Sequence, residues 1–189
     1  MDREALIEAI LDRELEMFLT VPVRHRASCQ DDPEGFRTFR RAQFLVCSKD
    51  TLESYAHDLT NAAQQGHNLM TLKYARMDNL IPVLNTNPVI DEMVDIQLEW
   101  QKEMCIKYPH LMARGRPLED NGYGYTSFKT YLRGELETYS DATLACLWKD
   151  MLERRRKGLN MTEEIYAHMV RGLGYSSLED AEAAARQGR

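Results

Sequence analysis

The feature that most constrains this fold is an internal repeat of helix-forming sequence. Residues 48–77 align with residues 140–169 without a gap. A fixed register of this kind marks two copies of one structural unit, so the chain is expected to build the same arrangement of helices twice. The identical positions are Ser48, Thr51, Leu52, Asp58, Gly66, Asn68, Tyr74 and Met77, which meet Ser140, Thr143, Leu144, Asp150, Gly158, Asn160, Tyr166 and Met169.

The repeat extends toward the N-terminus of each copy. In the same register, Phe36, Phe39, Arg41 and Gln43 meet Phe128, Tyr131, Arg133 and Glu135. Each of these segments is expected to form a short helix that begins at its phenylalanine, Phe36 or Phe128. With small gaps further upstream, Glu14, Leu15 and Glu16 meet Gln97, Leu98 and Glu99. We therefore place repeat 1 at residues 5–78, a linker at 79–88 and repeat 2 at 89–172, followed by a short C-terminal helix over 177–187 that Ser177 caps.

Apolar residues recur with helical spacing in both copies, and no segment alternates cleanly with period two. Ser48 and Ser140 are expected to cap helices, and Asn87–Pro88 is expected to open another as N-cap and first-turn proline. The pattern predicts an all-α protein. A copy of about 85 residues is small for an independent core, so we expect one globular domain over 1–189, a helical bundle whose tandem repeats are related by a pseudo-twofold axis.

Charge and hydropathy bear on the partners of the protein. The 189 residues carry a net charge of -6, which argues against broad binding of nucleic acid or of membrane surfaces. The N-terminal stretch lacks the apolar segment of a signal peptide, and no apolar run has transmembrane length. We expect a cytoplasmic protein with no nucleic-acid or membrane partner, and a homodimer remains open.

Two related loops hold candidate binding residues. Arg24 and Arg26 in the first copy correspond to Arg114 and Arg116 in the second. Guanidinium groups bind carboxylate or phosphate in bidentate fashion, so loops that converge near an axis would form an anion site. The alternative is that each arginine neutralises acidic residues of its own loop.

A second set of candidates consists of polar residues on apolar helix faces. They are Glu14 and Gln43 in the first copy, and Gln97, Glu135, Tyr131 and Tyr139 in the second. A buried carboxylate is costly unless it is paired or protonated. Glu14 and Glu135 are therefore candidates for a general acid–base pair, and the alternative is a hydrogen-bonded network with the amides and tyrosines.

The remaining reactive residues give weaker signals. Cys29 lies in the first arginine loop near His25, but its repeat position holds no cysteine, so we retain it only as a pocket-lining candidate. The four cysteines lack zinc-ligand spacing. Lys73 is a candidate for an ammonium group near the axis, and we favour the alternative of a solvated lysine. No metal site and no cofactor are predicted.

Four segments of the sequence carry a resemblance to a known family. They are LEMF at 15–18, RASCQDDPEGF at 26–36, NLMTLKYARMD at 68–78 and LRGELETYSD at 132–141. They resemble an uncharacterised family of bacterial proteins of unknown function along nearly the whole chain. The resemblance implies a bacterial, cytoplasmic protein and implies nothing about mechanism.

The first hypothesis for function is a cofactor-independent lyase, isomerase or hydrolase that acts on a small anionic metabolite between the two repeats. Loop arginines would hold the anion, and Glu14 and Glu135 would transfer protons. The second hypothesis is a helical module that binds a ligand or a protein without catalysis. The third is a di-metal carboxylate protein, although Glu53–His57 and Glu164–His168 depart from the Glu-x-x-His pattern of such sites.

Overall fold

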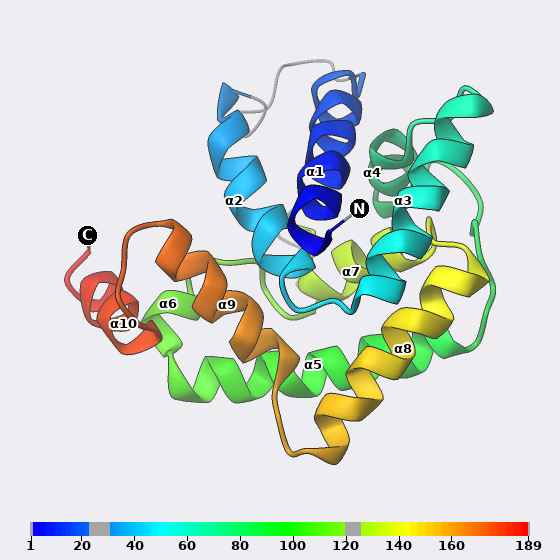
Figure 1. The fold of residues 1–189 in the computed structure, drawn as a ribbon. Coiled ribbons are helices and arrows are strands. Elements are labelled where there is room, and N and C mark those ends of the chain that lie inside the picture. The colour runs from blue at the N-terminus through cyan, green and yellow to red at the C-terminus, as the bar shows by residue number, and fades with distance from the viewer. Residues whose placement is uncertain (1, 23–30, 120–125, 189) are drawn as a thin grey trace.

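The computed structural model describes residues 2–22, 31–119 and 126–188, and all regular structure in these ranges is helical (Figure 1). No strand occurs among them, so the predicted all-α class is confirmed. The helices are α1 (Arg3–Leu19), α2 (Pro33–Phe44), α3 (Lys49–Gln64), α4 (Leu69–Met77), α5 (Val89–Lys107), α6 (Pro109–Met112), α7 (Phe128–Leu136), α8 (Asp141–Arg156), α9 (Met161–Gly172) and α10 (Leu178–Arg186).

The serine caps that the sequence predicts are present at three helix starts. Ser48 Oγ accepts a hydrogen bond from the Thr51 backbone N–H at 3.3 Å, and Ser140 Oγ accepts one from that of Thr143 at 3.2 Å. Ser177 caps α10 in the same way. Each cap pairs a backbone N–H that the helix itself leaves unpaired, which fixes where these helices begin.

Two helices begin at residues other than those expected from the sequence, and one further helix was not expected. Helix α5 has Pro88 rather than Asn87 at its N-cap, because the Asn87 side chain instead accepts from the Val89 N–H in a turn just before the helix. Helix α2 begins at Pro33, ahead of the expected Phe36, because Asp32 caps it and proline suits the first turn. The four-residue α6 is too short to show a periodic pattern.

Helices α3 and α8 pack together and hold each other's N-termini. Asp150 on α8 accepts from the Ser48 N–H at 2.9 Å and from the Thr51 hydroxyl at 2.7 Å. In the same way, Asp58 on α3 accepts a hydrogen bond from the Ser140 N–H at 3.0 Å and another from the Thr143 hydroxyl at 2.7 Å. The charged oxygen in each case meets the positive end of the partner helix dipole.

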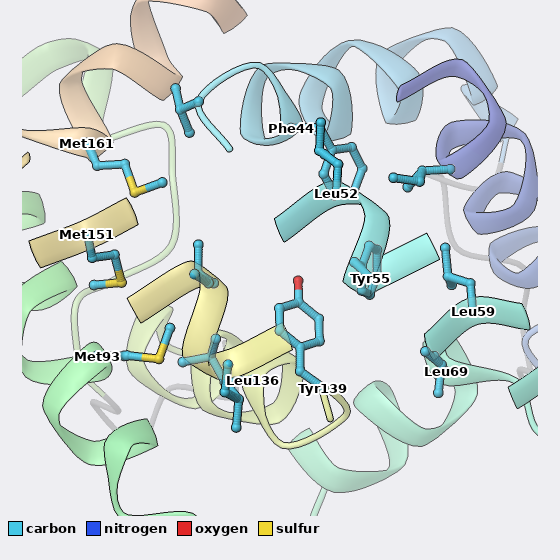
Figure 2. Close-up of a cluster of buried hydrophobic side chains, with 14 of the residues drawn as sticks. Phe44, Leu52, Tyr55, Leu59, Leu69, Met93, Leu136, Tyr139, Met151 and Met161 are labelled. Atoms are coloured by element: carbon cyan, nitrogen blue, oxygen red, sulfur yellow. The ribbon is translucent and has the colours of Figure 1, made fainter. Parts of the chain in front are cut away.

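The main core is formed by buried side chains from both halves of the chain (Figure 2). Leu52, Tyr55 and Leu59 of α3 belong to the same buried cluster as Leu136 and Tyr139 of the second half, and the ring centroids of Tyr55 and Tyr139 lie 4.9 Å apart. Burial of a side chain of this size contributes about 1.5–3 kcal/mol. The halves therefore share one core.

A smaller cluster attaches the C-terminal helix to the rest of the protein. It joins α10 to α5, α6 and α9, with Met104, Tyr108, Val170 and Leu178 at its centre. Figure 1 shows α10 beside α6 at one end of the molecule. Among the described helices, none has both the length and the apolar character needed to cross a bilayer.

Candidate functional site

A cavity of about 460 Å³ lies within the helical assembly. Its lining comes from helices α1, α2, α4, α5, α7, α8 and α9, together with residues between helices: Asp32, Val46, Cys47, Gly115, Arg116 and Tyr139. This volume falls in the range of about 300–1,000 Å³ that small-molecule sites occupy. The cavity is therefore large enough for a small organic ligand.

The lining takes matched positions from both sequence copies. Residues of α1 align with residues of α5 in the register that matches Glu14 with Gln97. The other helices of the two copies align in the gapless register. Both members of the following pairs line the cavity: Phe18 with Gln101, Phe36 with Phe128, Phe39 with Tyr131, Arg40 with Leu132, Gln43 with Glu135, Phe44 with Leu136, Cys47 with Tyr139, and Tyr74 with Tyr166. The two copies thus contribute equivalent positions to one space.

Much of the cavity wall is aromatic. Phe18 of α1 stacks on Phe36 of α2 with ring centroids 4.4 Å apart, and Tyr74 of α4 lies beside Phe18. Phe39 also lines the cavity and keeps 50% of its surface exposed. Flat, apolar faces of this kind favour a ligand with an aromatic or aliphatic body.

One side of the cavity is closed by a buried arginine that holds two carboxylates. Arg40 of α2 donates through Nε and Nη2 to Glu14 of α1, at 2.7 and 2.6 Å. Its Nη1 donates to Glu135 of α7 at 2.8 Å and also to Gln43. The bidentate geometry fixes the guanidinium plane, and Arg40 therefore ties three helices together.

Further partners complete the charge balance of this cluster. Lys73 Nζ donates to Glu135 Oε2 at 2.6 Å. The Tyr55 hydroxyl donates to Glu14 at 2.6 Å, and the Tyr139 hydroxyl donates to Glu135 at 2.8 Å. Two cations thus face two carboxylates, which is the condition under which buried charges are tolerated. We call Glu14, Arg40, Lys73 and Glu135, with their two tyrosines, the charged cluster.

The pKa values follow from this arrangement. Burial alone would raise the pKa of Glu135, but the positive charges of Arg40 and Lys73 outweigh it and hold that pKa well below its usual range. Burial and the neighbouring carboxylates raise the pKa values of Tyr55 and Tyr139. At neutral pH, Glu135 is therefore an anion and both tyrosines are hydrogen-bond donors.

The structure brings together a large part of the predicted site. Six of the candidate residues line the cavity: Gln43, Gln97, Arg116, Tyr131, Glu135 and Tyr139. Glu14 is fully buried in the charged cluster behind the lining, and Arg114 is exposed outside it. Arg24, Arg26 and Cys29 lie outside the described residues.

Arg116 stands out among the cavity residues because it is an exposed cation. Its guanidinium carbon lies 4.7 Å from the ring centroid of Tyr131, and its Nη1 donates to the Thr126 carbonyl at 3.1 Å. Within the described part of the chain it has no carboxylate partner. Stacking on the ring orients the guanidinium and leaves other N–H groups available to an anion.

Sequence reasoning missed both cations of the charged cluster, and it also missed Tyr55. Lys73, which we expected to be solvated, is almost completely buried, because Glu135 pairs with its ammonium and Tyr131 lies 3.7 Å from it. Arg40 received no role at all. Two carboxylates on apolar helix faces indicated that buried partners were needed, but they did not indicate which residues those partners are.

No group of three or more His, Cys, Asp or Glu side chains is placed to hold a metal ion among the residues that the structure describes.

Comparison with known proteins identifies a family and no activity. A family model described as a protein of unknown function, DUF4125, matches residues 4–183. The chain therefore belongs to that family. No curated protein and no solved structure matches the chain.

Proposed function

We propose that this member of the DUF4125 family binds a small anionic molecule in the cavity, and that its two repeats form the cavity about a pseudo-twofold axis. The observation that carries the proposal is Arg116, an exposed guanidinium stacked on Tyr131 at the edge of a cavity whose wall holds several aromatic rings. The ligand's acidic group lies against Arg116, and its apolar body lies against the phenylalanine rings.

The pseudo-twofold axis is supported by reciprocal contacts. Asp150 holds the N-terminus of α3 and Asp58 holds the N-terminus of α8, through matched serines and threonines. A contact in which each partner uses the same residues on the other is typical of twofold symmetry. The matched pairs in the cavity lining agree with an axis that passes near the cavity.

The anionic character of the ligand is supported by the charges around the cavity. The charged cluster is neutral overall, and the Arg40 guanidinium donates to Glu14, Gln43 and Glu135. Arg116 also lines the cavity. Its contacts among the described residues are the Tyr131 ring and the Thr126 carbonyl, and they include no carboxylate. An anion placed there gains a charge-assisted hydrogen bond from the guanidinium.

Acid–base catalysis by Glu14 and Glu135 together is less well supported than binding. Glu14 does not line the cavity, so it would not meet a ligand there. Glu135 does line it, as a carboxylate whose lowered pKa makes it a weak base. A lyase, isomerase or hydrolase reaction in this cavity would therefore rely on Glu135 with Tyr139, and we place it second.

The test uses two fluorescent probes that differ in one charged group. 1-Anilinonaphthalene-8-sulfonate carries an aromatic body and a sulfonate, and N-phenyl-1-naphthylamine is the same molecule without the sulfonate. We expect Arg116→Gln to weaken binding of the sulfonate about fivefold or more, from loss of about 1 kcal/mol, and to leave the neutral probe unchanged.

The matched control is Arg114→Gln, which removes the neighbouring exposed arginine outside the cavity lining. We expect this variant to bind both probes as the wild type does. The proposed anion site would be contradicted if both substitutions weakened binding of the sulfonate probe equally. It would also be contradicted if Arg116→Gln weakened binding of both probes to the same extent.

A further inference from the structure

Two buried polar atoms in the cavity lining lack a hydrogen-bond partner among the described residues. They are Oε1 of Gln101 on α5 and Oγ1 of Thr162 on α9. Each of these residues is only 4% exposed, and both line the cavity on helices that pack against each other. Native proteins rarely leave buried polar atoms unpaired, because the cost in free energy is not recovered elsewhere.

The repeat shows that the fold does not need polar residues at these positions. Gln101 corresponds to Phe18 of the first copy, and Thr162 corresponds to Met70. Phe18 and Met70 are both buried in the hydrophobic core. Because apolar side chains serve the same places in one copy, the polar ones in the other copy have a role other than packing.

The orientation of Gln101 defines the group that it can receive. Its Nε2 donates to the Tyr166 hydroxyl at 3.3 Å, which leaves the carbonyl oxygen as the unpaired end of the amide. A carbonyl oxygen accepts hydrogen bonds and cannot donate them. The complementary ligand group must therefore carry an N–H or O–H, and the Thr162 hydroxyl is able to pair with the same type of group.

We propose that Gln101 and Thr162 form a second polar subsite that binds a hydroxyl or amino group of the ligand. This inference rests on the proposed function, since it concerns the same cavity. It narrows the ligand class to organic acids that have an apolar body and, away from the acidic group, a hydrogen-bond donor.

The experiment measures affinities for a panel of naphthoates by competition with 1-anilinonaphthalene-8-sulfonate. The panel contains 2-naphthoate, its ring-hydroxylated isomers, and the methoxy analogue of each isomer, which cannot donate. We expect at least one hydroxy isomer to bind the wild type about tenfold more tightly than its methoxy analogue, as for a site with buried groups that need a donor.

Two variants remove the subsite without enlarging the cavity much: Gln101→Leu and Thr162→Val. In both, the preference for the hydroxy isomer should fall to less than about threefold, while unsubstituted 2-naphthoate, which lacks the donor, should bind no more weakly than it binds the wild type. Thr162→Val should also melt at a higher temperature than the wild type, because it removes an unpaired buried polar atom and no hydrogen bond. A purely structural role for Thr162 predicts a lower melting temperature instead. Gln101→Leu also loses the hydrogen bond to Tyr166, so only its ligand preference is used.

The outcomes separate this inference from the proposed function. If 2-naphthoate binds and Arg116→Gln weakens it, but no hydroxy isomer exceeds its methoxy analogue, the anion site stands and the subsite is wrong. The same holds if the preference persists in both variants. If no naphthoate shows dependence on Arg116, the proposed function itself fails.

Discussion

Arg40 shows how a single residue can determine the character of a buried region. It lies between Phe39 and Arg41 in a helix with several charged residues, and the neighbouring Arg41 makes exposed ion pairs with Glu4 and Glu8. Charged side chains are assigned to solvent by default, because they are seldom fully buried. The sequence pattern found Glu14 and Glu135 as polar residues on apolar faces, but it could not identify which cations pair with them.

The charged cluster predicts a pH-dependent effect of Glu135→Gln. At neutral pH this variant leaves Arg40 and Lys73 without their shared anion, so we expect the free energy of unfolding to fall by about 3–5 kcal/mol. The folded-state pKa of Glu135 lies below its ordinary value of 4.5, so its contribution to stability is fully present above pH 4.5 and is lost as the pH falls further. The stability difference between wild type and variant should therefore narrow below pH 4.5.

Urea unfolding of both proteins between pH 7 and pH 3 measures this difference. Glu16→Gln on the exposed face of α1 is the control, with an expected change within about 0.5 kcal/mol at pH 7. A stability difference for Glu135→Gln that stays constant down to pH 3 would show that Glu135 is not a buried anion.

At the scale of helices, the sequence was informative where local signals set the structure. Ser48, Ser140 and Ser177 were identified as caps because a short hydroxyl side chain before an apolar periodic run has one favoured role. The identity of Asp58 and Asp150 in the repeat also had a physical cause, which is the contact between α3 and α8. That cause was visible only in three dimensions, because each aspartate pairs with a residue far away in sequence.

Removal of these aspartates tests the helix contact. Asp150→Ala and Asp58→Ala each leave a backbone N–H and a threonine hydroxyl without their charged acceptor, so we expect each to lower the free energy of unfolding by about 1–3 kcal/mol. Asp150→Ala should have the larger effect, because Asp150 is buried and Asp58 is only half-buried.

Thermal or urea unfolding gives both values, and Asp95→Ala on the exposed face of α5 is the control, expected to change stability by less than about 0.5 kcal/mol. The account of the α3–α8 contact would be wrong if either aspartate variant matched Asp95→Ala.

At the scale of the whole molecule, the two aligned sequence segments differ in the residues that occupy matching positions of the alignment. Glu14, Tyr55 and Lys73 of the charged cluster correspond to Gln97, Leu147 and Ile165, and all three of the latter line the cavity. The first segment thus fills these positions with members of the charged cluster, and the second borders the cavity. The repeat led us to expect a pocket between the two copies, which stays a prediction. The difference between the two segments depends on packing and could not be read from the alignment.

The central claim is that an anionic molecule binds in this cavity, and methionine methyl groups report on it directly. Met161 and Met169 line the cavity, whereas Met70 and Met93 are buried elsewhere in the core. The measurement is the change in ¹³C-methyl resonances of methionine-labelled protein on titration with 1-anilinonaphthalene-8-sulfonate. We predict saturable shifts at Met161 and Met169, weakened by Arg116→Gln, with Met70 and Met93 little changed. Saturable binding that leaves Met161 and Met169 unshifted would contradict the claim.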